Sequence, residues 1–360
     1  MGRGPAPARF GTRCPVSADW TRCPGPGLPV VSNVMRYIEV GGERVSAIGL
    51  GAWQFGSREW GYGSHYAEHD AFDIVHRALD LGINLIDTAE MYGFGRSERI
   101  VGRAIADRRA EVFLASKVLP ILPLRAVVAR RAAGSARRLG VAQLDLYQLH
   151  WPNPAITLTE QMAAMRALQR SGVIRQIGVS NYSLDRWQAA EGALGGPVWS
   201  NQVRFSLVDR RPLKGLTQWA AANGRVVIAY SPLAQGLLSA RYDAEHRPTA
   251  MRANTAAFLP ENLDRARLLF DALREVAGRH DATPAQVALA WVISHPNVVA
   301  IPGASTVAQL QRNAEAADLE LTTEDEHRLA DAAEAYRPLR GVAAVPSLVR
   351  TWTARRGHRQ

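Results

Sequence analysis

Three observations predict an α/β fold that closes into a (β/α)8 barrel of the TIM type. Short β-like runs alternate with longer amphipathic stretches along almost the whole chain. Eight such β-like runs occur. With their helical stretches they form eight βα units in about 300 residues, and a barrel of eight βα units typically needs roughly 250 residues, so a closed barrel is favoured over an open doubly wound sheet.

The expected strands are short and apolar, and in chain order they are residues 47–50, 84–86, 112–115, 144–149, 174–179, 198–202, 226–229 and 299–301. Between them lie stretches with apolar residues at helical spacing, residues 70–82, 97–107, 158–172 and 283–296, and all but the second end in Gly or Pro. Ahead of the first strand, two β-like runs flank Gly41 and Gly42, a dipeptide suited to a type I′ hairpin turn. We expect this β-hairpin to close the bottom of the barrel.

Both ends of the chain differ in composition from the middle. Residues 1–34 are rich in Pro, Gly and Arg and lack the continuous apolar stretch of a secretory signal. We expect a disordered extension here, or a translation start at Met35, which an intact mass would decide. Residues 337–360 carry six Arg and no acidic residue. This basic tail is expected either to be disordered or to fold over the barrel mouth, which leaves residues 35–336 as the barrel domain.

The net charge of +10 lies mostly in these tails, because residues 1–34 contribute +3 and residues 337–360 contribute +6. The barrel is therefore close to neutral, which argues against a nucleic-acid-binding face. Both cysteines, Cys14 and Cys23, fall in the first segment, so no disulfide and no metal site is expected in the barrel. No apolar run approaches the ~20 residues of a membrane helix. We expect a cytoplasmic enzyme without a membrane or nucleic-acid partner, and the sequence makes no prediction of its oligomeric state.

Four titratable residues follow or end the early β-like runs: Asp87, Tyr92, Lys117 and His150. Each has a simpler explanation by itself, because Asp87 suits a helix cap, Tyr92 and Lys117 suit a surface, and His150 suits a hydrogen-bonded position at the barrel mouth. Parallel strands of a barrel, however, end at one face, where the active sites of this fold lie. The coincidence of all four at that face predicts an active site.

These four side chains suit the reduction of a carbonyl group by hydride. A free tyrosine has a pKa of about 10. We expect Lys117, held by an ion pair to Asp87, to lower the pKa of Tyr92, so that Tyr92 acts as a general acid toward a developing alkoxide. His150 would orient the carbonyl oxygen by a hydrogen bond.

A hydride donor is required, but the chain has no G-x-G-x-x-G motif after a strand, so a Rossmann domain is not expected. Glycines and polar residues gather instead at the ends of the later β-like runs, in 178–181, 201–202, 230–238 and 301–313. The last of these leads into a helical stretch, in the region where many barrels bind phosphate at backbone N–H groups. A nucleotide site at the barrel mouth is therefore expected.

Seven motifs, taken in order, resemble those of the aldo-keto reductases, a family of NAD(P)H-dependent carbonyl reductases on a (β/α)8 barrel. They are GLGAWQFG, GINLIDTAEMYGFGRSERIVGRAI, the strand end at Lys117, LDLYQLHWPNP, IGVSNY, YSPLAQGLL and IPGASTVAQLQRN. The resemblance covers residues 35 to about 336. It implies that Tyr92 is the proton donor, that Lys117 and Asp87 tune it, and that His150 orients the substrate.

The resemblance also implies a cofactor site, with NADPH as the expected cofactor and NADH as a possible one. Its residues are Gly51, Ala52 and Trp53, then Ser180, Asn181 and Gln202 at the carboxamide, Tyr230 stacked on the nicotinamide, Ser231, Pro232, Leu233 and Gly236 along the pyrophosphate, and Gly303, Ser305, Gln309 and Asn313 at the adenosine. Gly303 and Gln309 replace basic residues that many NADPH-specific members have, and Arg312 replaces a common acidic residue.

Two questions about the function stay open at this point. Trp53, Trp60 and Trp151 would form an aromatic wall that suits a small-molecule carbonyl substrate with an apolar body. Alternatively, arginines in the segment 239–260 would recognise an anionic one. The alternative to an enzyme is a cofactor-bound, redox-sensing subunit that binds a partner protein, like the potassium-channel β subunits.

Overall fold

The computed structural model describes residues 1–2, 35–57, 61–63, 67–248, 252–253 and 255–347. The chain divides into two units, Met1–Ser32 and Asn33–Gln360, and the fold described below belongs to the second. The expected N-terminal extension lies almost entirely outside the described residues. So do Trp60 of the expected aromatic wall and residues 348–360 of the basic tail.

Eight parallel strands form one sheet, and every strand expected from the sequence is among them. They are β3 (Leu50–Gly51), β4 (Leu85–Asp87), β5 (Phe113–Val118), β6 (Leu144–Leu149), β7 (Ile174–Ser180), β8 (Ser200–Arg204), β9 (Val226–Tyr230) and β10 (Val298–Ala300). Neighbours in the sheet are neighbours in the chain. A parallel bridge between Ile48 and Ala300 joins the first strand to the last, so the sheet closes into a barrel as predicted.

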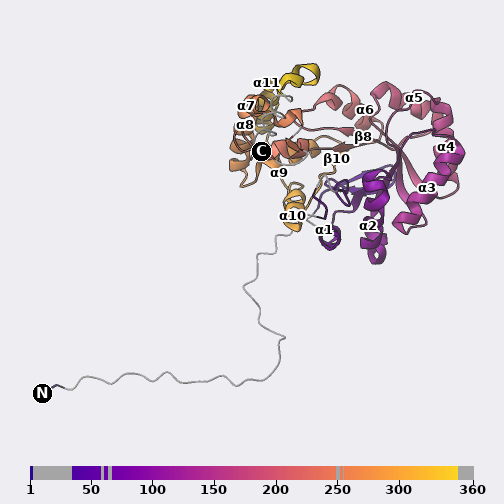
Figure 1. Cartoon of the computed structure of the whole chain (residues 1–360), viewed down its shortest axis with the longest axis horizontal. Coiled ribbons are helices and arrows are strands. Elements are labelled where there is room, and N and C mark those ends of the chain that lie inside the picture. Colours follow the sequence, from indigo (N-terminus) through magenta and orange to yellow (C-terminus); the bar gives the residue numbers. More distant parts are fainter. Residues whose placement is uncertain (3–34, 58–60, 64–66, 249–251, 254, 348–360) are drawn as a thin grey trace, which may run out of the picture. The chain divides into compact units, whose positions relative to one another are not determined.

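Helices follow the strands and lie outside them (Figure 1). They are α1 (Glu68–Asp80), α2 (Arg96–Ala104), α3 (Arg125–Leu139), α4 (Leu158–Arg170), α5 (Leu184–Leu194), α6 (Leu216–Ala222), α7 (Pro260–Arg265), α8 (Arg267–Arg279), α9 (Pro284–Ile293), α10 (Val307–Glu315) and α11 (Thr323–Ala335). Capping boxes begin α4 at Thr157, α9 at Thr283 and α11 at Thr322, where each threonine hydroxyl accepts the N3 amide.

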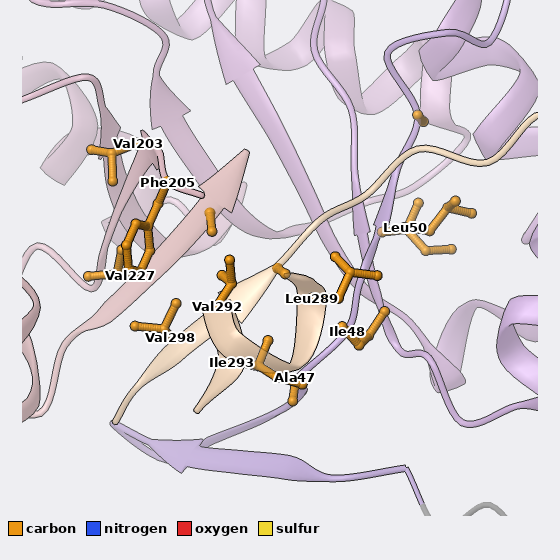
Figure 2. Close-up of a cluster of buried hydrophobic side chains, with 14 of the residues drawn as sticks. Ala47, Ile48, Leu50, Val203, Phe205, Val227, Leu289, Val292, Ile293 and Val298 are labelled. Atoms are coloured by element: carbon orange, nitrogen blue, oxygen red, sulfur yellow. The ribbon is translucent and has the colours of Figure 1, made fainter. Parts of the chain in front are cut away.

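The apolar face of α9 shows how the helices attach to the barrel. Leu289 and Val292 of α9 point toward the strands, where they meet Val298 of β10 and Ile48 beside β3 (Figure 2). All four residues are at most 1% exposed. This packing holds the last strand against the first and so supports the closed barrel.

The predicted hairpin closes the N-terminal end of the barrel. Strands β1 (Tyr37–Val40) and β2 (Glu43–Ser46) pair antiparallel, and Gly41 and Gly42 both have positive φ, as a type I′ turn requires. Val40 packs inside the barrel in one cluster with Leu85, the first residue of β4. The indole N–H of Trp199 also donates to the Val40 carbonyl at 3.0 Å.

The described part of the basic tail, residues 337–347, is folded. Leu339 exchanges two backbone hydrogen bonds with the buried Asn262 side chain of α7, at 2.7 and 3.1 Å. Ser347 donates to Glu261 at 2.8 Å. These eleven residues therefore follow neither of the two expectations, because they pack on α7 and none of them lines the large cavity described below. Within the described residues, no helix is long and apolar enough to cross a membrane.

Candidate active site

A cavity of about 1110 Å³ opens at the carboxyl ends of the strands. Its walls include Asp87 at the end of β4, Ser180 at the end of β7 and Tyr230 at the end of β9. This is the face at which the fold carries its active sites. With two exceptions, Lys117 and Ala52, all described residues predicted for catalysis, for the cofactor or for the aromatic wall line the cavity.

The two exceptions lie behind the cavity wall. Lys117 is completely buried beneath the floor. Ala52 is also completely buried. Its N–H donates to the Asp87 carbonyl at 2.8 Å, and its carbonyl accepts the hydroxyl of Ser97 at 2.7 Å. Ala52 thus joins β3 to β4 and α2 and does not line the cavity, and its contact with the cofactor stays a prediction.

The ammonium of Lys117 forms the centre of the site. Its Nζ donates to Asp87 Oδ1 at 2.5 Å, to the Thr88 carbonyl at 3.0 Å and to Tyr92 Oη at 3.1 Å. Asp87 is 2% exposed and Lys117 is completely buried, so water has little access to the ion pair. Three residues expected to work together are thus in direct contact.

The second carboxylate oxygen of Asp87 is held by two amides. Gln202 Nε2 donates to Asp87 Oδ2 at 2.8 Å, and Gln148 Nε2 lies 3.4 Å from the same oxygen. Gln148 was not expected in the site. It stands two residues before His150 on β6, and because alternate strand residues share a face, that spacing was the signal that could have revealed it.

Helix α2 braces the two strands that carry the ion pair. Its buried Ser97 lies 2.8 Å from Thr88 Oγ1, beside Asp87. Its Glu98, which is also buried, accepts the hydroxyl of Ser116 at 2.7 Å and the guanidinium of Arg138 at 2.5 Å. Ser116 precedes Lys117, so these contacts limit the movement of the strand ends that carry Asp87 and Lys117.

Burial raises the pKa of Tyr92, and Lys117, which favours the phenolate, opposes this only in part. The sequence-based expectation of a lowered pKa is therefore wrong in its net direction, because the cost of burying a phenolate exceeds the attraction of the ammonium. Burial by itself would lower the pKa of Lys117, but Asp87 and Tyr92 outweigh it and raise that pKa. At neutral pH the tyrosine is thus protonated and the lysine charged.

His150 is a neutral imidazole at working pH. Burial, assisted by the nearby Lys117 charge, lowers its pKa to about 2. Its ring lies edge-on to Tyr92, with 5.8 Å between the centroids, and stacks on Trp151 at 3.9 Å. A neutral imidazole donates one hydrogen bond without bringing a proton that competes with Tyr92.

A row of polar groups continues from the catalytic end along the cavity. Tyr230 Oη donates to Asn181 Oδ1 at 2.9 Å, and Asn181 Nδ2 donates to the His150 carbonyl at 3.2 Å. Ser180 donates to the Gln202 carbonyl at 2.9 Å. Asn181 and Ser231 have φ of 61° and 51°, so the chain turns sharply as it leaves β7 and β9 and its side chains face the cavity.

The far end of the cavity lies at the start of α10. The Ser305 N–H donates to Gln309 Oε1 at 2.9 Å, and Thr306 caps the helix. A side chain at Gly303 would place its Cβ 2.5 Å from Gln54 Oε1, so the Gln54 amide would have to move to admit it. Gln54 in turn donates to the Ala304 carbonyl at 2.7 Å, which connects the loop after β3 to the loop after β10.

The cavity carries an excess of positive charge. Among the described residues that line it, Asp87 is the only acidic one, and it is paired with Lys117. Five arginines line it, namely Arg96, Arg204, Arg241, Arg252 and Arg312. Arg96 and Arg204 were not singled out from the sequence, although Arg204 follows Gln202 by two positions on β8 and so shares its face.

Comparisons with known proteins identify the family to which this chain belongs. The model of the aldo/keto reductase family matches residues 47–334. The chain is 53% identical over 323 residues to an uncharacterized oxidoreductase of Mycobacterium tuberculosis (strain ATCC 25618 / H37Rv), covering 89% of this chain and 100% of the relative. It is 34% identical over 300 residues to the methylglyoxal reductase YeaE of Escherichia coli (strain K12), covering 83% and 94%.

A solved structure gives the same result. It is an aldo/keto reductase from Klebsiella pneumoniae in complex with NADP and acetate, 33% identical, with a TM-score of 0.68 and coverage of 85% of this chain and 96% of that chain. The segment that the family model matches, residues 47–334, spans the whole barrel and contains all four catalytic candidates. The chain therefore belongs to the aldo/keto reductase family of NAD(P)H-dependent oxidoreductases.

Proposed function

We propose that this enzyme reduces an aldehyde or ketone to an alcohol with NADPH, and that Tyr92 gives the proton. The contact between Tyr92 Oη and Lys117 Nζ, at 3.1 Å on the floor of the cavity, carries this proposal. When bound, NADPH supplies the hydride that reaches the carbonyl carbon. The protonated Tyr92 donates its proton to the carbonyl oxygen, and Lys117 stabilises the phenolate that remains.

The other groups of the site hold the carbonyl for this step. Neutral His150 donates a hydrogen bond to the carbonyl oxygen and so supports the developing negative charge. Asp87 keeps Lys117 charged and in place, since its pair with the ammonium is buried. Gln148 and Gln202 keep the carboxylate oriented through its second oxygen.

The chemistry of the cavity fits a nicotinamide dinucleotide. Ser180, Asn181 and Gln202 would hold the carboxamide, and the Tyr230 ring would support the nicotinamide. The arginines in the lining complement the phosphates. NADPH carries an additional 2′-phosphate, and the exposed Arg312 on α10, which is in no ion pair with the described residues, would recognise it. This favours NADPH and leaves NADH as the weaker cofactor.

The test compares wild type with Tyr92→Phe in an assay of NADPH oxidation against aromatic and aliphatic aldehydes. NADPH binding is followed separately by fluorescence. We expect the variant to bind NADPH as wild type does and to lose activity by at least about a hundredfold, in line with the loss of a general acid. Full activity in Tyr92→Phe would refute the role of Tyr92. Tight NADPH binding by a wild type that reduces no aldehyde would instead favour the redox-sensing subunit.

A further inference from the structure

The chain takes an unusual path directly after the catalytic tyrosine. In η2 (Tyr92–Gly95), φ is 54° at Gly93, 54° at Phe94 and 81° at Gly95. Glycine adopts this left-handed conformation freely, but a bulky side chain does so at a cost. Phe94 is therefore the strained residue of this turn.

Packing of the Phe94 ring does not compensate for this backbone strain. Its relative exposure is 94%, whereas a phenylalanine normally contributes to stability by being buried. An asparagine would suit both the left-handed backbone and the contact with water. A residue that is unfavourable in both respects, beside a catalytic group, indicates a function that stability does not explain.

Phe94 belongs to an apolar rim around the catalytic end of the cavity, which we define as Trp53, Met91, Phe94 and Trp151. All four line the cavity, and each is exposed. The Trp53 centroid lies 6.4 Å from that of Tyr92, and Trp151 stacks on His150. Two residues of the rim therefore lie beside the two groups that are expected to hold the carbonyl oxygen.

We propose that Phe94 is a specificity-determining residue that packs against the apolar or aromatic body of the carbonyl substrate. This inference rests on the proposed function. A substrate whose carbonyl oxygen lies at Tyr92 and His150 extends its remaining part outward, toward the rim. An aromatic or long aliphatic aldehyde buries the Phe94 ring there and gains contact area, whereas a three-carbon aldehyde does not reach it.

The experiment measures kcat/KM with NADPH for two probes, 4-nitrobenzaldehyde and propanal. The quantity compared is the ratio of kcat/KM for 4-nitrobenzaldehyde to that for propanal. Phe94→Asn removes the ring and suits the backbone. We expect the ratio to fall about tenfold, because the lost contact affects only the aromatic probe. Phe94→Tyr keeps a ring of nearly the same area, so we expect it to keep the wild-type ratio within about twofold.

Leu122 provides a matched control for the backbone effect. It has a φ of 47°, is 58% exposed and does not line the cavity. Leu122→Asn relieves the same kind of strain, so both asparagine variants should melt at or above the wild-type temperature. Only Phe94→Asn should change the ratio.

The possible results separate this inference from the proposed function. A wild type that reduces neither probe contradicts the proposed function itself. A wild type that reduces both probes, with an unchanged ratio in Phe94→Asn, overturns the role of Phe94 and leaves the function intact. An equal fall of the ratio in Leu122→Asn, or a fall in Phe94→Tyr as large as in Phe94→Asn, would also overturn it.

Discussion

Replacing Asp87 with asparagine should destabilise the protein in a way that depends on pH. Asp87 is 2% exposed and Lys117 is completely buried, so the variant leaves a buried ammonium whose nearest partners are neutral. Breaking a buried ion pair from one side typically costs about 3–5 kcal/mol. At about 2 °C per kcal/mol for a domain of this size, the melting temperature should fall by about 6–10 °C at pH 7.

The sign of the pH dependence follows from Lys117. In wild type its pKa is raised, so its contribution to stability is present below the unfolded value of about 10.4 and is lost as pH rises through the raised pKa. Without Asp87 the effect of burial dominates and lowers the pKa of Lys117. The variant is therefore less stable at pH values below the unfolded pKa, and its stability increases as pH rises. The difference between wild type and Asp87→Asn should therefore shrink from pH 7 to pH 10.

Thermal denaturation from pH 7 to pH 10 measures this difference. Glu98→Gln is the matched control, because it breaks another pair with a buried carboxylate but leaves Arg138, which stays charged over this range. Its penalty should not change with pH. The double variant Asp87→Asn with Lys117→Met removes both charges and should be more stable than Asp87→Asn alone. A constant penalty in Asp87→Asn, or a double variant that is less stable than it, would refute the reasoning.

Three further predictions concern single side chains. Burial lowers the pKa of His150 to about 2, so the contribution of His150 to stability is present above the unfolded pKa of about 6.5 and is lost as pH falls. Between pH 7 and pH 4 the melting temperature of wild type should therefore fall more than that of His150→Gln, and an equal fall in both would contradict this. Gln148→Glu should be active at pH 5, where a protonated carboxyl still donates to Asp87, and its kcat should fall as pH rises. The kcat of the control Gln176→Glu, at the barrel bottom, should not fall, and a kcat of Gln148→Glu that does not change with pH would argue against a positioning role for Gln148. Arg312→Gln should raise the Kd of NADPH about tenfold and that of NADH less than about threefold in fluorescence titrations, and an equal change in both would exclude a contact with the 2′-phosphate.

Much of the fold could be predicted from local patterns. The eight strands and the Gly41-Gly42 hairpin are all present, because short apolar runs and turn glycines depend on neighbouring residues alone. The placement of Asp87 and Lys117 close together could also be predicted, since parallel strands of a barrel all end at one face. Gln148 was missed although its spacing from His150 places both residues on one face of the strand, because the sequence does not identify its partner Asp87, which is 61 residues away in the chain.

By itself, then, the sequence determined the barrel and the face on which the candidate site lies, because periodicity and strand order decide these. The four catalytic candidates were predicted from their chemical types and from the resemblance to the family. Only the tertiary structure decided three other properties. It showed that burial outweighs Lys117 and raises the pKa of Tyr92. It placed residues 337–347 on α7. It also revealed Phe94 as an exposed ring on a left-handed backbone. Desolvation, docking of a distant segment and backbone conformation depend on contacts between residues far apart in the chain, and no local pattern encodes those contacts.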